Sequence, residues 1–148
     1  MAKITVGNSF FDRQIQEEPA LVRLSKCRDI PTKASYWLSR ILKELSGLNT
    51  VYMEEKQKII EKWAMRDADG VLKTKWETLN EDGTVKTEEN TYKFGDHGQD
   101  FSRDFIELLN IENELPFEKV ALALDKVPVG VLNAYDYQEL EPFVAFEE

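Results

Sequence analysis

The sequence predicts one long amphipathic helix between Pro31 and Trp63, and this helix limits the folds that the chain can adopt. Nine positions recur there in alternating steps of four and three, and seven of them are apolar. They are Ala34, Leu38, Ile41, Leu45, Leu48, Tyr52, Glu55, Ile59 and Lys62. A seven-residue repeat keeps one stripe of side chains on one side of a helix. We therefore predict a helix over about residues 32–65 whose stripe faces a packing partner.

The predicted helix is long for a chain of this size. At about 1.5 Å per residue it spans roughly 50 Å, whereas a compact chain of 148 residues has a diameter of about 38 Å. We therefore expect part of the helix to pair with something beyond its own globule. Gly47 lies inside this helix, where glycine costs about 1 kcal/mol relative to alanine. Its presence predicts either a kink or a point of close helix packing.

Shorter elements are predicted before the long helix. Residues 3–6 are typical of a strand, and a first helical turn is expected from Ser9 through Ile15. A further helix is expected over residues 19–27, because proline is well tolerated at a first helical position. The residue before a proline disfavours helical backbone, so the long helix is expected to begin after Pro31, with Thr32 as its N-cap.

The pattern changes after a turn predicted at residues 67–70. Residues 72–78 alternate between uncharged and charged side chains, which indicates a strand with one buried and one solvent-exposed face. Residues 85–94 are expected to form the returning strand of a hairpin. Asp100 is expected to cap a helix that buries Phe101, Phe105 and Leu108. Pro116 is expected to end this part of the chain.

The end of the chain predicts a buried strand, a short helix and a docked tail. Residues 117–127 are typical of the strand, and Asn133 and Asp136 have the spacing of a capping box for the helix. The apolar residues 143–146 are expected to dock on the body.

Together these elements predict an α+β fold. We expect an N-terminal helical hairpin with one long helix, followed by a small antiparallel β-hairpin or sheet with two further helices. A single domain is expected over residues 1–148, with a helical part at 1–66 and an acidic α+β part at 67–148.

The net charge of −9 is unevenly divided along the sequence. Residues 1–66 carry 12 Lys and Arg against 8 Asp and Glu, whereas residues 67–148 carry 7 against 20, a balance of −13. An acidic segment repels phosphates, so nucleic acid is not expected as a ligand there. The acidity would suit a basic partner or would serve solubility alone, and both interpretations remain open.

Membrane and export signals are not expected. No uncharged apolar run approaches 18 residues, and the first residues lack the apolar stretch of a signal peptide. The only cysteine, Cys27, cannot form an internal disulfide, which is consistent with a reducing cytosol, and we expect it to be a buried small apolar residue.

The only histidine, His97, is the one place where the sequence could support catalysis. Asp96 and Asp100 lie close to it, and carboxylates converging with a histidine can hold a metal or move a proton. Turn and capping roles account for both aspartates, however. The sequence at 67–70 resembles a calcium loop, but Met65 and Trp76 stand where that loop needs acids. We therefore predict no catalytic residue, no cofactor and no metal.

Large side chains on and beside the helical stripe are candidates for a protein interface. Tyr36 and Trp37 flank the stripe, and such aromatics either belong to the core or anchor a partner. The candidate interface residues are Trp37, Leu45, Leu48, Tyr52, Met53, Ile59 and Trp63.

Three short motifs carry a resemblance to a known group of proteins. They are Ile30-Pro31-Thr32-Lys33-Ala34-Ser35-Tyr36-Trp37-Leu38-Ser39-Arg40, Lys58-Ile59-Ile60-Glu61-Lys62-Trp63 followed by Asp69-Gly70, and Leu140-Glu141-Pro142-Phe143. In this order they resemble small phage and prophage proteins of unknown function. That group has no established activity and transfers no functional residue. The resemblance implies a viral or prophage origin, and hence a location in the host cytoplasm or in the virion.

Three functions are expected from these features. The first is a non-enzymatic phage interaction protein that acts in virion assembly or as a minor structural component, with a protein partner reached by self-association or on a phage or host protein. The second is an acidic inhibitor of a host protein that mimics nucleic acid. The third is an enzyme centred on His97.

Overall fold

The computed structural model of the chain describes residues 3–12 and 19–148, and its class is α+β, as predicted. The chain divides into two compact units. Unit 1 comprises Met1–Val51 and Asn110–Glu148, and unit 2 comprises Tyr52–Leu109. This division does not follow the change in composition near residue 66, because both ends of the chain belong to unit 1. No helix in the described ranges is long and apolar enough to cross a membrane.

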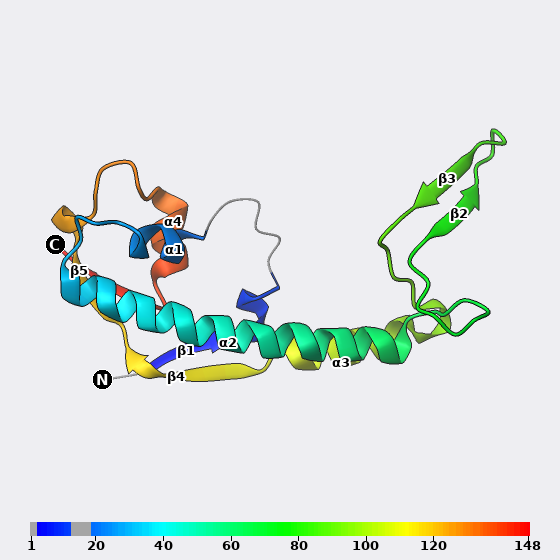
Figure 1. Ribbon diagram of the computed structural model, residues 1–148, viewed down its shortest axis with the longest axis horizontal. Coiled ribbons are helices and arrows are strands. Elements are labelled where there is room, and N and C mark those ends of the chain that lie inside the picture. Colours follow the sequence, from blue (N-terminus) through cyan, green and yellow to red (C-terminus); the bar gives the residue numbers. More distant parts are fainter. Residues whose placement is uncertain (1–2, 13–18) are drawn as a thin grey trace. The chain divides into compact units, whose positions relative to one another are not determined.

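The first strand of unit 1 pairs with a strand from late in the sequence. Strand β1 (Lys3–Gly7) runs antiparallel to β4 (Glu112–Glu118), as Figure 1 shows. This confirms the strand predicted at residues 3–6. Pro116 was expected to end an element, but it lies inside β4. The register shifts between Lys3 and Thr5, opposite that proline, and a proline without an N–H is tolerated where a ladder is interrupted.

The predicted strand at 117–127 is divided into shorter elements. The end of β4 is followed by β5 (Val120–Ala123) and by a 3₁₀ turn, η3 (Leu124–Lys126). Strand β5 pairs in parallel with β6 (Val144–Glu147). The predicted docking of the tail is confirmed, because Phe143 and Val144 are buried in the core.

The short helices of unit 1 agree with the sequence pattern. Helix α1 (Ala20–Ser25) lies beside α4 (Ala134–Leu140) (Figure 1). The capping box is confirmed, since the Asp136 N–H donates to Asn133 Oδ1 at 3.0 Å and the Asn133 N–H donates to Asp136 Oδ2 at 2.8 Å. The first turn, η1 (Asn8–Phe10), begins the segment predicted to reach Ile15, which lies outside the described residues.

The hydrophobic core of unit 1 forms around the first half of the long helix α2 (Thr32–Trp63). The buried residues on this helix are Ala34, Leu38, Ile41 and Leu45. The helix begins at Thr32, but the Pro31 carbonyl accepts the Ser35 N–H, so Pro31 rather than Thr32 is the capping residue. From Pro31 to Leu45 the predicted stripe is the face that the core covers.

The second half of α2 departs from the predicted stripe. Tyr52 is buried, but the next buried residues are Ile60 and Ala64, whereas Ile59 is half-buried and Lys62 is exposed. An α-helix drifts by about 20° per seven residues relative to a strict heptad repeat, so the covered face moves to the neighbouring positions. The helix continues through Gly47. The alternative prediction of close helix packing at Gly47 is wrong, because nothing lies within 4 Å of the position that a Cβ would occupy.

Unit 2 contains a two-stranded hairpin, β2 (Trp76–Leu79) and β3 (Val85–Glu88). The turn predicted before it is confirmed: Asp67 Oδ1 accepts the N–H groups of Asp69 and Val71, and Gly70 adopts a positive φ of 80°. Both strands are shorter than predicted. The predicted alternation is found up to residue 77, because Leu72, Thr74 and Trp76 are half-buried whereas Lys73, Lys75 and Glu77 are exposed; Thr78 is exposed and departs from it. Within the hairpin itself only Trp76 and Glu88, at one end, are partly covered.

The remaining helix of unit 2 is α3 (Gly98–Leu109), which follows a 3₁₀ turn, η2 (Gly95–His97). The helix begins two residues before Asp100, so Asp100 lies in the first turn and is not the cap. The predicted apolar face is confirmed. Leu108 is buried, and the ring of Phe101 stacks on Phe94 and Phe105 with centroid distances of 3.9 and 5.5 Å.

Candidate functional site

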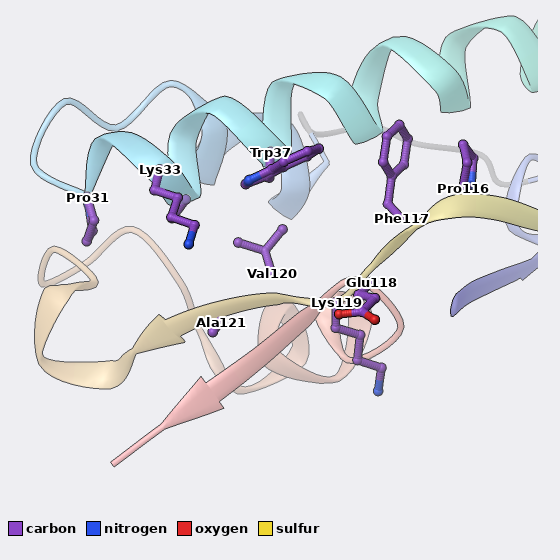
Figure 2. Close-up of a pocket in the computed structure, with 10 residues that line it drawn as sticks. Pro31, Lys33, Trp37, Pro116, Phe117, Glu118, Lys119, Val120 and Ala121 are labelled. Carbon is purple, nitrogen blue, oxygen red and sulfur yellow. The ribbon is translucent and has the colours of Figure 1, made fainter. Parts of the chain in front are cut away.

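Unit 1 has a hollow of about 630 Å³ between the start of α2 and the segment that joins β4 to β5. Figure 2 shows Trp37 and Lys33 extending from α2 toward this segment, and Phe117 and Val120 extending from it toward α2. Lys119 also lines the hollow, with its side chain pointing away from α2 in this view. The hollow therefore joins residues that are about 80 positions apart in the sequence.

Four side chains beside the hollow form an aromatic–arginine cluster, which we define as Tyr36, Trp37, Arg40 and Phe117. The Trp37 ring lies 5.2 Å from that of Tyr36 and 6.1 Å from that of Phe117, measured between centroids. The Arg40 guanidinium lies 5.5 to 5.9 Å from all three ring centres, and its Nη1 donates to the Tyr36 hydroxyl at 3.1 Å. Each exposed cation–π contact contributes about 0.5–1 kcal/mol, so these contacts favour this arrangement of the side chains before anything binds.

The helical part of the cluster follows from spacing along α2. Tyr36 and Arg40 are four residues apart and Trp37 and Arg40 are three apart, so their side chains lie on the same side of the helix. This side is next to the buried stripe of Ala34, Leu38 and Ile41, and it remains accessible: Tyr36 is 54% and Trp37 37% exposed.

The hollow is positively charged in a chain that is acidic overall. Lys33 and Lys119 line it, Arg40 lies beside it over the Trp37 ring, and among the described residues that line it Glu118 is the one acid. Among residues 3–12 and 19–148, no carboxylate lies within ion-pair distance of those three cations. The hollow therefore favours a ligand that carries negative charge beside an apolar or aromatic group.

The structure distributes the predicted interface residues over several environments. Trp37 lies in the hollow, Leu45 and Tyr52 are buried, Leu48 and Ile59 are half-buried, and Met53 is exposed. Trp63 is half-buried and its Nε1 donates to Asp104 Oδ2 at 2.7 Å. Of this set, only Trp37 and Met53 are exposed, Trp37 to 37%.

Two members of the cluster were missed from the sequence. The spacing of Arg40 from Tyr36 and Trp37 is a signal that could have indicated its role. Phe117 gives no such signal, because only the folded chain brings β4 to α2.

In the structure, His97 contacts Asp100 and Trp63. His97 is exposed, its Nδ1 lies 3.1 Å from Asp100 Oδ2, and its ring packs against Trp63 at 5.1 Å. Asp100 also accepts from Arg103 at 3.3 Å. No group of three potential metal ligands is found in the part of the chain that the structure describes.

Asp104 and Cys27 have perturbed pKa values with structural causes. The hydrogen bond from Trp63 is the main influence that lowers the pKa of Asp104, and Arg103 and Lys62 add to it. Burial, with a smaller contribution from Asp29, raises the pKa of the Cys27 thiol. The thiol therefore stays protonated at neutral pH and packs against the core of unit 1.

Comparison with family models, curated proteins and solved structures found no match to this chain. The resemblance to small phage proteins therefore stays a prediction.

Proposed function

We propose that this chain is a non-enzymatic interaction protein that binds a protein partner at the hollow. The observation that carries the proposal is the aromatic–arginine cluster, with its accessible Tyr36 and Trp37 rings arranged around Arg40. Tryptophan, tyrosine and arginine are the residues that most often dominate the binding energy of protein interfaces.

The order within the cluster supports this proposal. The Tyr36 hydroxyl holds Arg40, and the Arg40 guanidinium lies near both Trp37 and Phe117. Side chains that are already ordered lose less conformational entropy when a partner binds. Tyr36 and Trp37 lie outside the buried core of unit 1, so the fold does not account for their full apolar surface, whereas Phe117 packs partly against that core.

The resemblance to phage proteins gives this proposal a biological setting. The partner would be a phage or host protein, and the chain would act in virion assembly or as a minor structural component. Because the cations at the hollow have no ion-pair partner among the described residues, the partner protein would present an acidic segment with an apolar side chain.

The second candidate function is inhibition of a basic host protein through the acidic residues. Its support is the exposed hairpin of unit 2, where Glu81 and Glu89 are accessible. The units themselves carry similar charges, −4 for unit 1 and −5 for unit 2, so the acidic half of the sequence is not one acidic body. Replacing Glu81, Asp82, Glu88 and Glu89 with lysine would abolish such binding, and unchanged binding would exclude it.

Affinity capture tests the leading proposal. The tagged chain would retain its partner from infected host cells, the partner would be identified by mass spectrometry, and the purified pair would be titrated by calorimetry. We expect Trp37→Ala and Arg40→Ala each to weaken the affinity by at least about tenfold, as truncation of central interface residues does.

A matched control uses another exposed tyrosine of unit 1. Tyr135 is 83% exposed and does not line the hollow, so Tyr135→Ala should leave the affinity unchanged, whereas Tyr36→Ala should lower it. Circular dichroism would verify that each variant is folded. Equal affinity of the wild type and all three cluster variants would show that the hollow is not the binding site.

A further inference from the structure

The hairpin of unit 2 has one face that nothing in the described chain covers. Side chains alternate across a strand, so Glu77, Leu79, Val85 and Thr87 share one face, which we call the outer face. Leu79 and Val85 are paired across the strands and are 73% and 58% exposed. The opposite face carries Trp76, whose Nε1 donates to the Thr91 carbonyl at 2.8 Å.

An exposed two-stranded hairpin of this kind gains little stability by itself. Isolated hairpins are marginal in water and normally need packing on one face. Here the inner face packs Trp76 between Lys73 and Lys93, at 4.5 and 5.2 Å from its ring, while the outer face leaves an apolar pair in solvent. The outer face therefore has the character of a surface that a partner covers.

The charge of the hairpin is opposite to that of the hollow. Residues 76–89 carry five acids and one lysine, a balance of −4. Glu88 is paired with Lys86 and Lys93, and Asp82 accepts from Thr84. Glu77, Glu81 and Glu89 have no ion-pair partner within the described ranges. The hairpin thus offers unpaired carboxylates beside an apolar pair, the chemistry that the hollow favours.

We propose that the outer face of the hairpin docks into the hollow of a second copy of this chain. This inference rests on the proposed function of the hollow as a protein-binding site, and it names the partner. Leu79 and Val85 would cover the rings of Trp37 and Phe117, and the carboxylates of Glu77 and Glu81 would face Lys33 and Arg40.

Such a contact joins two different surfaces, so it is heterologous. Each copy would offer one hollow and one hairpin, and repeated contacts would build either a closed ring or an open filament. Self-association of this type fits a protein that takes part in assembly.

Sedimentation velocity with two complementary variants tests the proposal. The hollow variant is Trp37→Ala, and the hairpin variant combines Leu79→Ser with Val85→Ser at exposed positions. We expect the wild type to form dimers and larger species as concentration rises, and each variant alone to remain monomeric. An equimolar mixture of the variants should form a heterodimer and nothing larger, because one intact hollow and one intact hairpin remain.

Charge variants provide a second measurement that does not depend on apolar truncation. Lys33→Glu should weaken association, and adding Glu77→Lys should restore part of it. Association of the wild type should also weaken as salt is raised, because exposed charges are screened. Val71→Ser, at an exposed apolar position of unit 2 outside the hairpin, is the control and should associate like the wild type.

Three results would overturn the inference: a wild-type chain that is monomeric at millimolar concentration, association that survives in both variants, or a variant mixture that fails to form a heterodimer. If a captured partner is still lost with Trp37→Ala, the hollow remains a binding site and only the identity of its partner was wrong. If Trp37→Ala affects neither self-association nor partner capture, the proposed function fails as well.

Discussion

At the residue scale, Asp136 carries a buried carboxylate that needs hydrogen-bond partners. Arg23 Nη2 donates to its Oδ1 at 2.6 Å, and the Asn133 N–H donates to its Oδ2 at 2.8 Å. Arg23 Nη1 also donates to the Val131 carbonyl at 2.7 Å. Burial by itself would raise the pKa of Asp136, but the hydrogen bonds from Arg23 and Asn133 outweigh it, so the pKa is lowered. One carboxylate therefore both caps α4 and joins it to α1.

Replacing this carboxylate should destabilise unit 1. We expect Asp136→Asn to lower the free energy of unfolding by about 2 kcal/mol, because hydrogen bonds to charged groups contribute about 1.5–3 kcal/mol. Urea unfolding followed by circular dichroism measures the change. Asp125→Asn, at an exposed position, is the control and should stay within about 0.5 kcal/mol of the wild type. Equal stability of the two variants would contradict the role given to Asp136.

The same carboxylate predicts how stability depends on pH. Its pKa is lower in the folded chain than its ordinary value of 3.8, so its contribution is complete above that value. The contribution is lost as pH falls through the lower, folded pKa. We expect wild-type stability to decrease below about pH 4, and Asp136→Asn to decrease less over that range. If the free energy of unfolding of the two proteins fell equally below about pH 4, Asp136 would not be the group responsible.

At the exposed His97, the expected effect of a substitution is small. His97→Ala removes the contact with Asp100, but Arg103 still donates to that carboxylate. We expect the free energy of unfolding to change by no more than about 0.5 kcal/mol, as for most surface substitutions. Partner capture should also be unchanged. A variant that folds normally but loses a biological activity would instead favour the enzyme hypothesis.

At the scale of elements, α2 shows how a regular pattern and a packed fold can diverge. The heptad spacing predicts the buried face through Leu45, where the core of unit 1 covers it. Further along, the covered positions become Ile60 and Ala64. The heptad repeat therefore predicts the length of the helix correctly, whereas the residues that are buried in its second half depend on what packs against them.

Glycine substitutions test the local conformations of α2 and of the following turn. Gly47 is exposed within the helix and has space for a Cβ, so Gly47→Ala should stabilise the protein by about 0.5–1 kcal/mol. Gly70 has a φ of 80°, so Gly70→Ala should destabilise it by about 1 kcal/mol. Thermal unfolding of both variants gives the comparison. A loss of stability in Gly47→Ala would mean that the helix is interrupted there.

At the scale of the whole molecule, the two units differ in how they are held together. Unit 1 has a continuous core that draws on strands β1, β4, β5 and β6 and on helices α1, α2 and α4. The hairpin of unit 2 has exposed strands whose covered residues are confined to the Trp76 end. Local opening requires little free energy where few apolar contacts are lost.

Hydrogen exchange should distinguish these regions. In dilute solution we expect the amides of β2 and β3 to exchange rapidly through local opening, and those paired between β1 and β4 to exchange only when unit 1 unfolds. Mass spectrometry of peptides after deuterium labelling measures both rates. Equal protection of the hairpin and of β1 in dilute solution would contradict this prediction.

Features that depend on neighbouring residues could be predicted from the amino-acid sequence. These include the start of α2 after Pro31, the capping box of Asn133 and Asp136, and the turn at Gly70, because backbone sterics and local hydrogen bonds act over a few residues. Three features became apparent only in the folded chain: Pro116 lies within β4, Arg23 reaches Asp136, and Phe117 contacts Trp37. These pairings join segments tens of residues apart, and their geometry depends on how the intervening chain packs, which no local pattern encodes.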